Sequence, residues 1–277
     1  MSYESKHEAI DAEVEPLISH PGPLHTRAIG KILAIWAVFT AIGIIIALFL
    51  PQHLFPVGYG TEQHDVVLTF VVFTIAAAPV AALVYAVTFY SLFAWRKKGS
   101  GKSDTPPPDG APIHGNSAVA SVWIGVSVVL VLFLLVWGMT ELGAETQTEA
   151  NVIRVNVTGQ QWMWTFSYPG TGVTSPTLIV PEGRQVKFQV TSEDVAHGFW
   201  PVQLGVQIDA MPNVTNLISA TPNKLGTFAV RCSQICGLYH AYMQTTGQVV
   251  TNAQFAQWLT NHGASTSSVK SYALSGK

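Results

Sequence analysis

The sequence predicts a membrane-anchored α + β protein in which three transmembrane helices precede an antiparallel β-sandwich or barrel. The 277-residue chain is 48% hydrophobic but only 11% charged, well below the roughly 25% of ordinary soluble domains. Its first half contains three long stretches without charge, and its second half alternates short apolar and polar runs. A purely soluble enzyme is therefore not expected. The net charge of −2, without a long basic run, argues against nucleic acid as a partner.

Three apolar runs account for the predicted helices. They cover residues 29–50, 67–94 and 118–139, and each reaches the roughly 20 residues that a helix needs to cross about 30 Å of hydrocarbon. Pro79 lies inside the second run. We expect it to kink the helix without ending it, because neighbouring helices can satisfy the carbonyl that it frees. The predicted anchor therefore spans residues 28–140, after an N-terminal tail at residues 1–27.

Basic residues predict the orientation of the anchor. The connection after the second span carries Arg96, Lys97, Lys98 and Lys102, whereas residues 51–65 contain no Lys or Arg. Because basic connections stay in the cytoplasm, we expect a cytoplasmic N-terminus and a C-terminal half on the outer face of a prokaryotic plasma membrane. A cleaved signal peptide is the alternative for the first span. The stretch before that span is too long and too acidic for this reading, so we expect an uncleaved helix.

Short alternating runs predict the β domain, at residues 141–262. Gly, Pro and Asn separate these runs at the intervals expected of an antiparallel sandwich or barrel of about 100 residues. A short helix is predicted at 253–261 after Asn252 as a cap, and residues 263–277 are expected to form a flexible tail. The predicted strands cover residues 152–158, 161–167, 177–180, 185–191, 226–231 and 247–251.

The stretch Cys232-Ser-Gln-Ile-Cys236-Gly-Leu-Tyr-His240-Ala-Tyr-Met243 predicts a metal site. Soft sulfur with imidazole selects copper or zinc, and a thioether favours copper, because zinc sites rarely use Met. A mononuclear blue-copper loop needs one Cys, so the second thiolate suggests a second ion. Two bridged ions would each need a terminal nitrogen, and His240 supplies only one. His197, which follows the strand predicted at 185–191, is the candidate for the other.

These motifs carry a resemblance to a known family. The segments His197-Gly-Phe-Trp200, Asp209-Ala-Met-Pro212 and Gln161-Trp-Met-Trp164 occur together with the Cys-x-Gln-x-Cys-x3-His-x2-Met loop. In combination they resemble the CuA domain of subunit II of haem-copper cytochrome c oxidases, over about residues 66–251. Residues 116–123 also resemble the start of that subunit's last membrane helix. The first predicted helix is additional to the family's usual two.

The resemblance implies a cupredoxin-like domain with a dinuclear copper centre, CuA. Cys232 and Cys236 would bridge the two coppers, His197 and His240 would each bind one, and Met243 would be a weak axial ligand. The backbone carbonyl of Gln234 would be the remaining ligand. Electrons would enter at an exposed Trp162, whereas Trp164 is expected on the opposite strand face, in the core.

The function implied is that of the electron-accepting subunit of cytochrome c oxidase, an oxidoreductase and proton translocase. The centre would accept electrons from an external donor, such as cytochrome c or a small copper protein, and pass them to haem in a separate subunit I, which reduces oxygen to water. Subunit III and membrane lipid are further expected partners. Haem is expected only in the partner subunit, because this chain has no Cys-x-x-Cys-His for haem c.

Two positions depart from the family's pattern. Many relatives have Glu where Gln234 stands, and that carboxylate helps to hold a magnesium ion. An amide is a poorer magnesium ligand, so magnesium is not expected here, and Gln resembles the B-type oxidases instead. Ala120, three residues before Trp123, replaces a Glu that opens a proton path into subunit I in many relatives. That path must then begin elsewhere or be used differently.

Three alternative functions differ in what they require. The small subunit of a CuA-containing nitric oxide reductase would share every ligand and differ only in its large partner. A membrane-tethered copper carrier would need an open, exchangeable site, which six ligands disfavour. A quinol oxidase subunit would lack the copper ligands, all of which are present here.

Overall fold

The structure, a computed structural model, describes residues 26–94, 117–145 and 152–273. Most of the predicted N-terminal tail lies outside these residues, as do Asn116 and the four basic residues at 96–102 on which the predicted orientation depends. The chain forms two compact units, residues 1–49 with 72–134 and residues 50–71 with 135–277. The second unit contains the β domain together with the connection that follows the first long helix.

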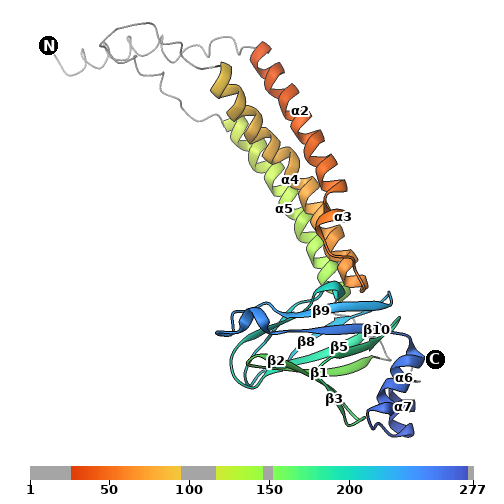
Figure 1. The fold of residues 1–277 in the computed structure, drawn as a ribbon. Helices are drawn as coiled ribbons and strands as arrows, with labels where there is room; N and C mark the ends of the chain where they lie inside the picture. The colour runs from red at the N-terminus through yellow and green to blue at the C-terminus, as the bar shows by residue number, and fades with distance from the viewer. Residues whose placement is uncertain (1–25, 95–116, 146–151, 274–277) are drawn as a thin grey trace, which may run out of the picture. The chain divides into compact units, whose positions relative to one another are not determined.

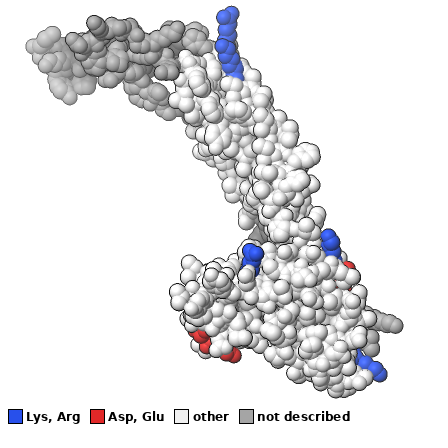
Figure 2. All heavy atoms as spheres, viewed as in Figure 1, with Lys and Arg blue, Asp and Glu red and all other residues white. Residues whose placement is uncertain are grey.

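Three long apolar helices carry the predicted spans: α2 (Thr26–Phe49), α4 (Thr61–Ala94) and α5 (Ser117–Glu145). By length and composition the candidate membrane spans are Arg27–Leu54, Thr61–Ala94 and Ser117–Gly143, and each contains one predicted run. Figure 2 shows no charged side chain between the ends of these helices on the face drawn. Almost all of their side chains are left uncovered by this chain, which suits contact with lipid or with partner helices.

Pro79 lies within α4 without ending it, as predicted. The indole Nε1 of Trp36, on α2, donates a hydrogen bond of 2.8 Å to the Pro79 carbonyl. This contact links the first and second long helices, whereas the carbonyl that Pro79 leaves without its helical donor is that of Ile75, four residues earlier.

Two five-stranded sheets form the β domain, in the orders β3-β2-β1-β5-β8 and β4-β10-β9-β6-β7 (Figure 1). Along β5 the burial alternates, so Val186, Phe188 and Val190 face a common core. The strands are β1 (Ile153–Gln160), β2 (Met163–Tyr168), β3 (Val173–Ser175), β4 (Leu178–Pro181), β5 (Val186–Ser192), β6 (His197–Pro201), β7 (Ile208–Ala210), β8 (Asn216–Ala220), β9 (Gly226–Cys232) and β10 (Gln244–Val250).

The sheets differ from the expectation in two respects. They are mixed rather than wholly antiparallel, because β1 pairs with β5 and β4 pairs with β10 in parallel. Neither pair is consecutive in the chain, so local periodicity does not reveal its direction. The strands β3, β6, β7 and β8 were also not predicted. They have only three to five residues, too few for a clear alternation.

The C-terminal residues are ordered more fully than expected. Helix α6 (Asn252–Asn261) begins with a capping box on Thr251 rather than with Asn252 as the cap. The predicted flexible tail instead contains helix α7 (Thr266–Ala273). Its Tyr272 donates from the hydroxyl to the carbonyl of Arg154 and accepts a 2.8 Å hydrogen bond from the Arg184 guanidinium at its own carbonyl. These contacts attach α7 to the β domain, although its composition alone does not predict a helix.

The connection between α2 and α4 packs against the β domain, within the same unit. After helix α3 (Pro51–Leu54), the N–H of Tyr59 donates to the Gln203 carbonyl at 2.8 Å. The N–H of Thr221 donates to both carboxylate oxygens of Glu62, each at 2.9 Å. A side chain at Gly226 would collide with the Tyr59 ring. Residues 55–63, called the outer segment below, are therefore part of the β domain's surface.

Candidate metal centre

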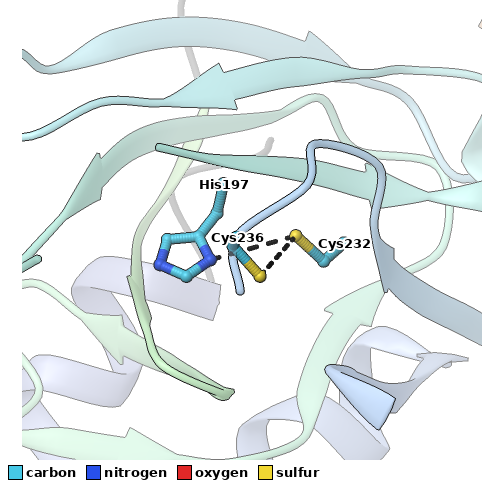
Figure 3. A group of neighbouring side chains, drawn as sticks. All are labelled: His197, Cys232 and Cys236. Carbon is cyan, nitrogen blue, oxygen red and sulfur yellow. Dashed lines mark hydrogen bonds between the residues drawn. The ribbon is translucent and has the colours of Figure 1, made fainter. Parts of the chain in front are cut away.

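Three potential metal ligands meet at one end of the β domain: His197, Cys232 and Cys236 (Figure 3). Their ligand atoms all lie within 4.8 Å of one another. The two Sγ atoms are 3.7 Å apart, and the Cys232 Sγ is 3.9 Å from Nδ1 of His197. Among the described residues, this is the group of His, Cys, Asp and Glu side chains arranged to hold a metal ion.

Neighbouring strands bring these residues together. His197 begins β6 and Cys232 ends β9, and the two strands pair with Phe199 opposite Cys232. The N–H of Ser233 donates to the Gly198 carbonyl at 2.9 Å. A Cβ atom at Gly198 would lie 2.1 Å from the Ser233 hydroxyl, so a side chain there would push the β9–β10 loop away from His197. Glycine at this position lets the loop approach closely.

The other predicted ligands belong to the same loop. Nδ1 of His240 is 3.6 Å and Sδ of Met243 is 3.7 Å from the Cys236 Sγ. The carbonyl oxygen of Gln234 is 3.2 Å from the Cys232 Sγ, while the Gln234 side chain is exposed. Tertiary structure thus brings all six predicted ligand residues together, with one imidazole beside each thiol.

The donor atoms suit a bound copper centre. His197, Cys236 and Met243 are almost completely buried, whereas His240 is partly exposed. Burial, with the Cys232 thiol as a second cause, raises the pKa of Cys236 to about 12. Deprotonation of the Cys236 thiol therefore needs a nearby cation, which a bound metal would provide. Two thiols and a thioether are soft ligands of the kind that copper prefers, and imidazole also suits copper.

Asp194 orients the buried imidazole. Its Oδ1 lies 2.8 Å from Nε2 of His197, and its Oδ2 accepts a 2.7 Å hydrogen bond from the N–H of Gln161. Although burial alone would raise the pKa of Asp194, hydrogen bonds from His197, Gln161 and Val195 lower it to about 2. A carboxylate on Nε2 favours the tautomer that presents Nδ1 to a metal. Asp194 was not predicted as part of the site, although a carboxylate three residues before a predicted histidine ligand is a usable signal.

Gln161 and Trp162 lie against the metal-binding loop. The side-chain amide of Gln161 donates to the Cys236 carbonyl at 2.7 Å. The Trp162 ring meets the Tyr239 ring edge to face at 4.8 Å. Trp162 is partly buried, less exposed than expected, whereas Trp164 is 2% exposed and lies in the core, as predicted.

The expectation that opposite strand faces separate Trp162 from Trp164 is wrong, because residues two apart in a strand share a face. Strand β2 begins only at Met163, and Trp162 lies in the turn before it. The turn therefore accounts for their different surroundings.

Comparison with known proteins points to one family. The profile of "Cytochrome C oxidase subunit II, periplasmic domain" matches residues 172–250, which include all six predicted ligands but not Trp162. Cytochrome c oxidase subunit 2 of Alkalihalophilus pseudofirmus is 29% identical over 192 residues, covering 67% of this chain and 55% of that one. The subunit 2 of Thermostichus vulcanus is 38% identical over 115 residues, covering 41% and 35%. The chain thus spans about half or less of these relatives' length.

A solved structure is similar in sequence as well. The crystal structure of the periplasmic domain of subunit II of cytochrome oxidase of Bradyrhizobium japonicum is 30% identical, with 40% of this chain and 92% of that chain covered and a TM-score of 0.38. The predicted fold class is confirmed. Three long apolar helices precede a two-sheet domain that matches the family's cupredoxin-like periplasmic domain.

Proposed function

Because the chain belongs to the cytochrome c oxidase subunit II family, we propose that it is the electron-accepting subunit of a terminal respiratory oxidase. An external donor delivers electrons to a dinuclear copper centre in the β domain. The electrons then pass to haem in subunit I, where oxygen is reduced to water. The three long helices anchor the chain beside subunit I, and subunit III completes the assembly.

One observation carries this proposal: the six predicted ligand residues converge as two linked halves. His197 and the Gln234 carbonyl lie beside Cys232, while His240 and Met243 lie beside Cys236. When bound, two copper ions bridged by the thiolates would supply a one-electron centre that rearranges little as its charge changes. The buried donors disfavour a copper carrier, which needs an exchangeable site.

This chain's own residues prepare the site for that role. Asp194 orients His197, and Gln161 links the turn at Trp162 to the Cys236 carbonyl. These two hydrogen bonds restrain His197 and the backbone at Cys236, which limits movement of the site during electron transfer. The exposed Gln234 amide lacks the charge of a magnesium-binding carboxylate, so we propose a centre without the magnesium ion.

The orientation completes the proposal. We place the β domain on the outer face of a prokaryotic plasma membrane and the N-terminus in the cytoplasm, because the basic connection at 96–102 favours the cytoplasm. The outer segment packs on the β domain, so both lie on the same side.

The purified chain, loaded with copper, tests this function. We expect two coppers per chain and an EPR spectrum of one unpaired electron shared between them. Cys236→Ser should abolish the shared signal, because it removes a bridging thiolate. One copper per chain, or the four-line pattern of a localised mononuclear copper, would overturn the dinuclear proposal.

A further inference from the structure

Hydrogen bonds connect Gln161 to both halves of the predicted copper centre. Its backbone N–H donates to Oδ2 of Asp194 at 2.7 Å, and Oδ1 of the same carboxylate lies 2.8 Å from Nε2 of His197. Its side-chain amide donates to the Cys236 carbonyl at 2.7 Å. One residue therefore reaches His197, in the first half, through Asp194, and reaches Cys236, in the second half, directly.

The two halves are attached to the β domain in different ways. His197 begins β6 and Cys232 ends β9, so the first half lies on paired strands. Cys236 lies in the loop between β9 and β10, outside any helix or strand. Among the described residues, Gln161 is the one outside this loop that hydrogen-bonds the Cys236 carbonyl. The Gln161 amide is therefore a restraint on the second half that strand pairing does not provide.

Gly237 makes room for the amide of Gln161. Its φ of 121° lies in the left-handed region that favours glycine. A Cβ atom at Gly237 would lie 2.9 Å from Nε2 of Gln161 and 3.4 Å from the Trp162 ring. A side chain at this position would push the amide away from the Cys236 carbonyl. The metal-binding loop thus has a glycine where it contacts the turn that carries Gln161.

We propose that Gln161 is a positioning residue that holds the two halves in register, so that two bound coppers share one unpaired electron equally. This inference rests on the proposed function, which requires a dinuclear centre. Equal sharing needs matched surroundings for the two ions, and groups that hydrogen-bond the ligand residues set those surroundings. Without the amide, the backbone at Cys236 shifts relative to Cys232, the surroundings become unequal, and the electron is shared unequally.

The test uses the purified full chain loaded with copper. Gln161→Met keeps a long side chain but removes the donor, while the backbone N–H that bonds Asp194 remains. We expect two coppers per chain, the parental melting temperature, and an EPR hyperfine pattern with unequal splittings from the two coppers. Competition with a copper chelator should show an affinity about tenfold lower, at the lower end of the range for losing a group that orients a metal ligand.

The chain offers a matched control beside the tested residue. Gln160 ends β1 and is exposed, so Gln160→Met makes the same chemical change one residue away and should keep the parental spectrum and affinity. Gln161→Lys supplies an N–H donor of at least equal reach, and we expect it to recover equal sharing and most of the affinity. Because Gln161 is itself an exposed residue, these substitutions leave the core of the domain unchanged.

Three results would overturn the positioning role. They are a parental spectrum and affinity in Gln161→Met, equal changes in the Gln160 and Gln161 variants, and a much lower melting temperature in Gln161→Met, which would show a structural role instead. The parental chain separates this inference from the proposed function. If it binds two coppers that share one electron while one of these results holds, the role of Gln161 is wrong and the proposed function stands. A parental chain with one copper would overturn the proposed function itself.

Discussion

The carboxylate of Asp194 lies 2.8 Å from Nε2 of His197, and Nδ1 of the same ring faces the Cys232 thiol at 3.9 Å. One side chain outside the predicted ligand set thereby determines which imidazole nitrogen a metal would meet. The same carboxylate accepts the N–H of Gln161, so it also ties the turn before Trp162 to the ligand.

Asp194→Ala should weaken copper binding about 10- to 100-fold, the usual effect of removing a carboxylate that orients a histidine ligand. Asp194→Asn should have a smaller effect, because the amide oxygen can still accept from Nε2. Competition with a copper chelator measures the affinity. Glu193→Gln, at the exposed neighbouring acid, is the control. Equal affinities in the parent and the Asp194→Ala chain would show that the imidazole is held by other contacts.

Gln234→Ala should leave two coppers bound and only adjust their potential, because the proposed ligand is the backbone carbonyl and the side chain is exposed. Metal analysis and the absorption spectrum check this, with Cys236→Ser as the variant that loses the shared-valence centre. Complete metal loss in a folded Gln234→Ala chain would mean that the amide itself is a ligand.

Trp162→Phe should preserve copper content and absorption yet slow electron uptake from the donor by about an order of magnitude or more. The indole carries the contact with Tyr239 and extends toward the loop that holds Cys236, and a smaller ring shortens that connection. Stopped-flow kinetics measure the rate. A parental rate in this variant would place the point at which electrons enter elsewhere on the domain.

Trp164→Ala should lower the free energy of unfolding by about 3 to 5 kcal/mol, because the ring is 2% exposed and packs on Phe199 and His197. Thermal melts of the solubilised chain give the comparison, with Trp162→Phe as the matched aromatic control. If the Trp162 variant melts much lower than the Trp164 variant, the two tryptophans have been assigned the wrong way round.

Glu62→Ala should destabilise the β domain by about 1 to 3 kcal/mol, because the N–H of Thr221 loses both acceptor oxygens. Asp65→Ala, one turn further along α4, controls for the loss of a negative charge.

A fragment from about residue 145 contains all proposed ligands, so we expect it to fold and bind copper. It should melt below the full chain, since it lacks the outer segment. A fragment as stable as the full chain would show that the outer segment contributes nothing.

The sequence by itself determined the apolar helices and the candidate members of the ligand set. It also predicted Trp164 in the core, but for the wrong reason, since Trp162 lies in the turn before β2 and not on the opposite strand face. Local features can be identified from the sequence alone. Examples are the charge-free runs and the spacing of Cys232, Cys236, His240 and Met243. The parallel pairing of β1 with β5 and the packing of residues 266–273 were not visible in this way, because they depend on contacts between segments far apart in the chain.

Only the tertiary structure decided what surrounds the ligands. Asp194 lies beside His197, Gln161 bonds the Cys236 carbonyl from 75 residues away, and Glu62 bonds Thr221 from 159 residues away. Composition does not predict these hydrogen bonds, because each depends on where folding places its donor and acceptor. The candidate ligands could therefore be identified one by one from the sequence, whereas the orientation of His197 and the hydrogen bonds around the site follow from the fold.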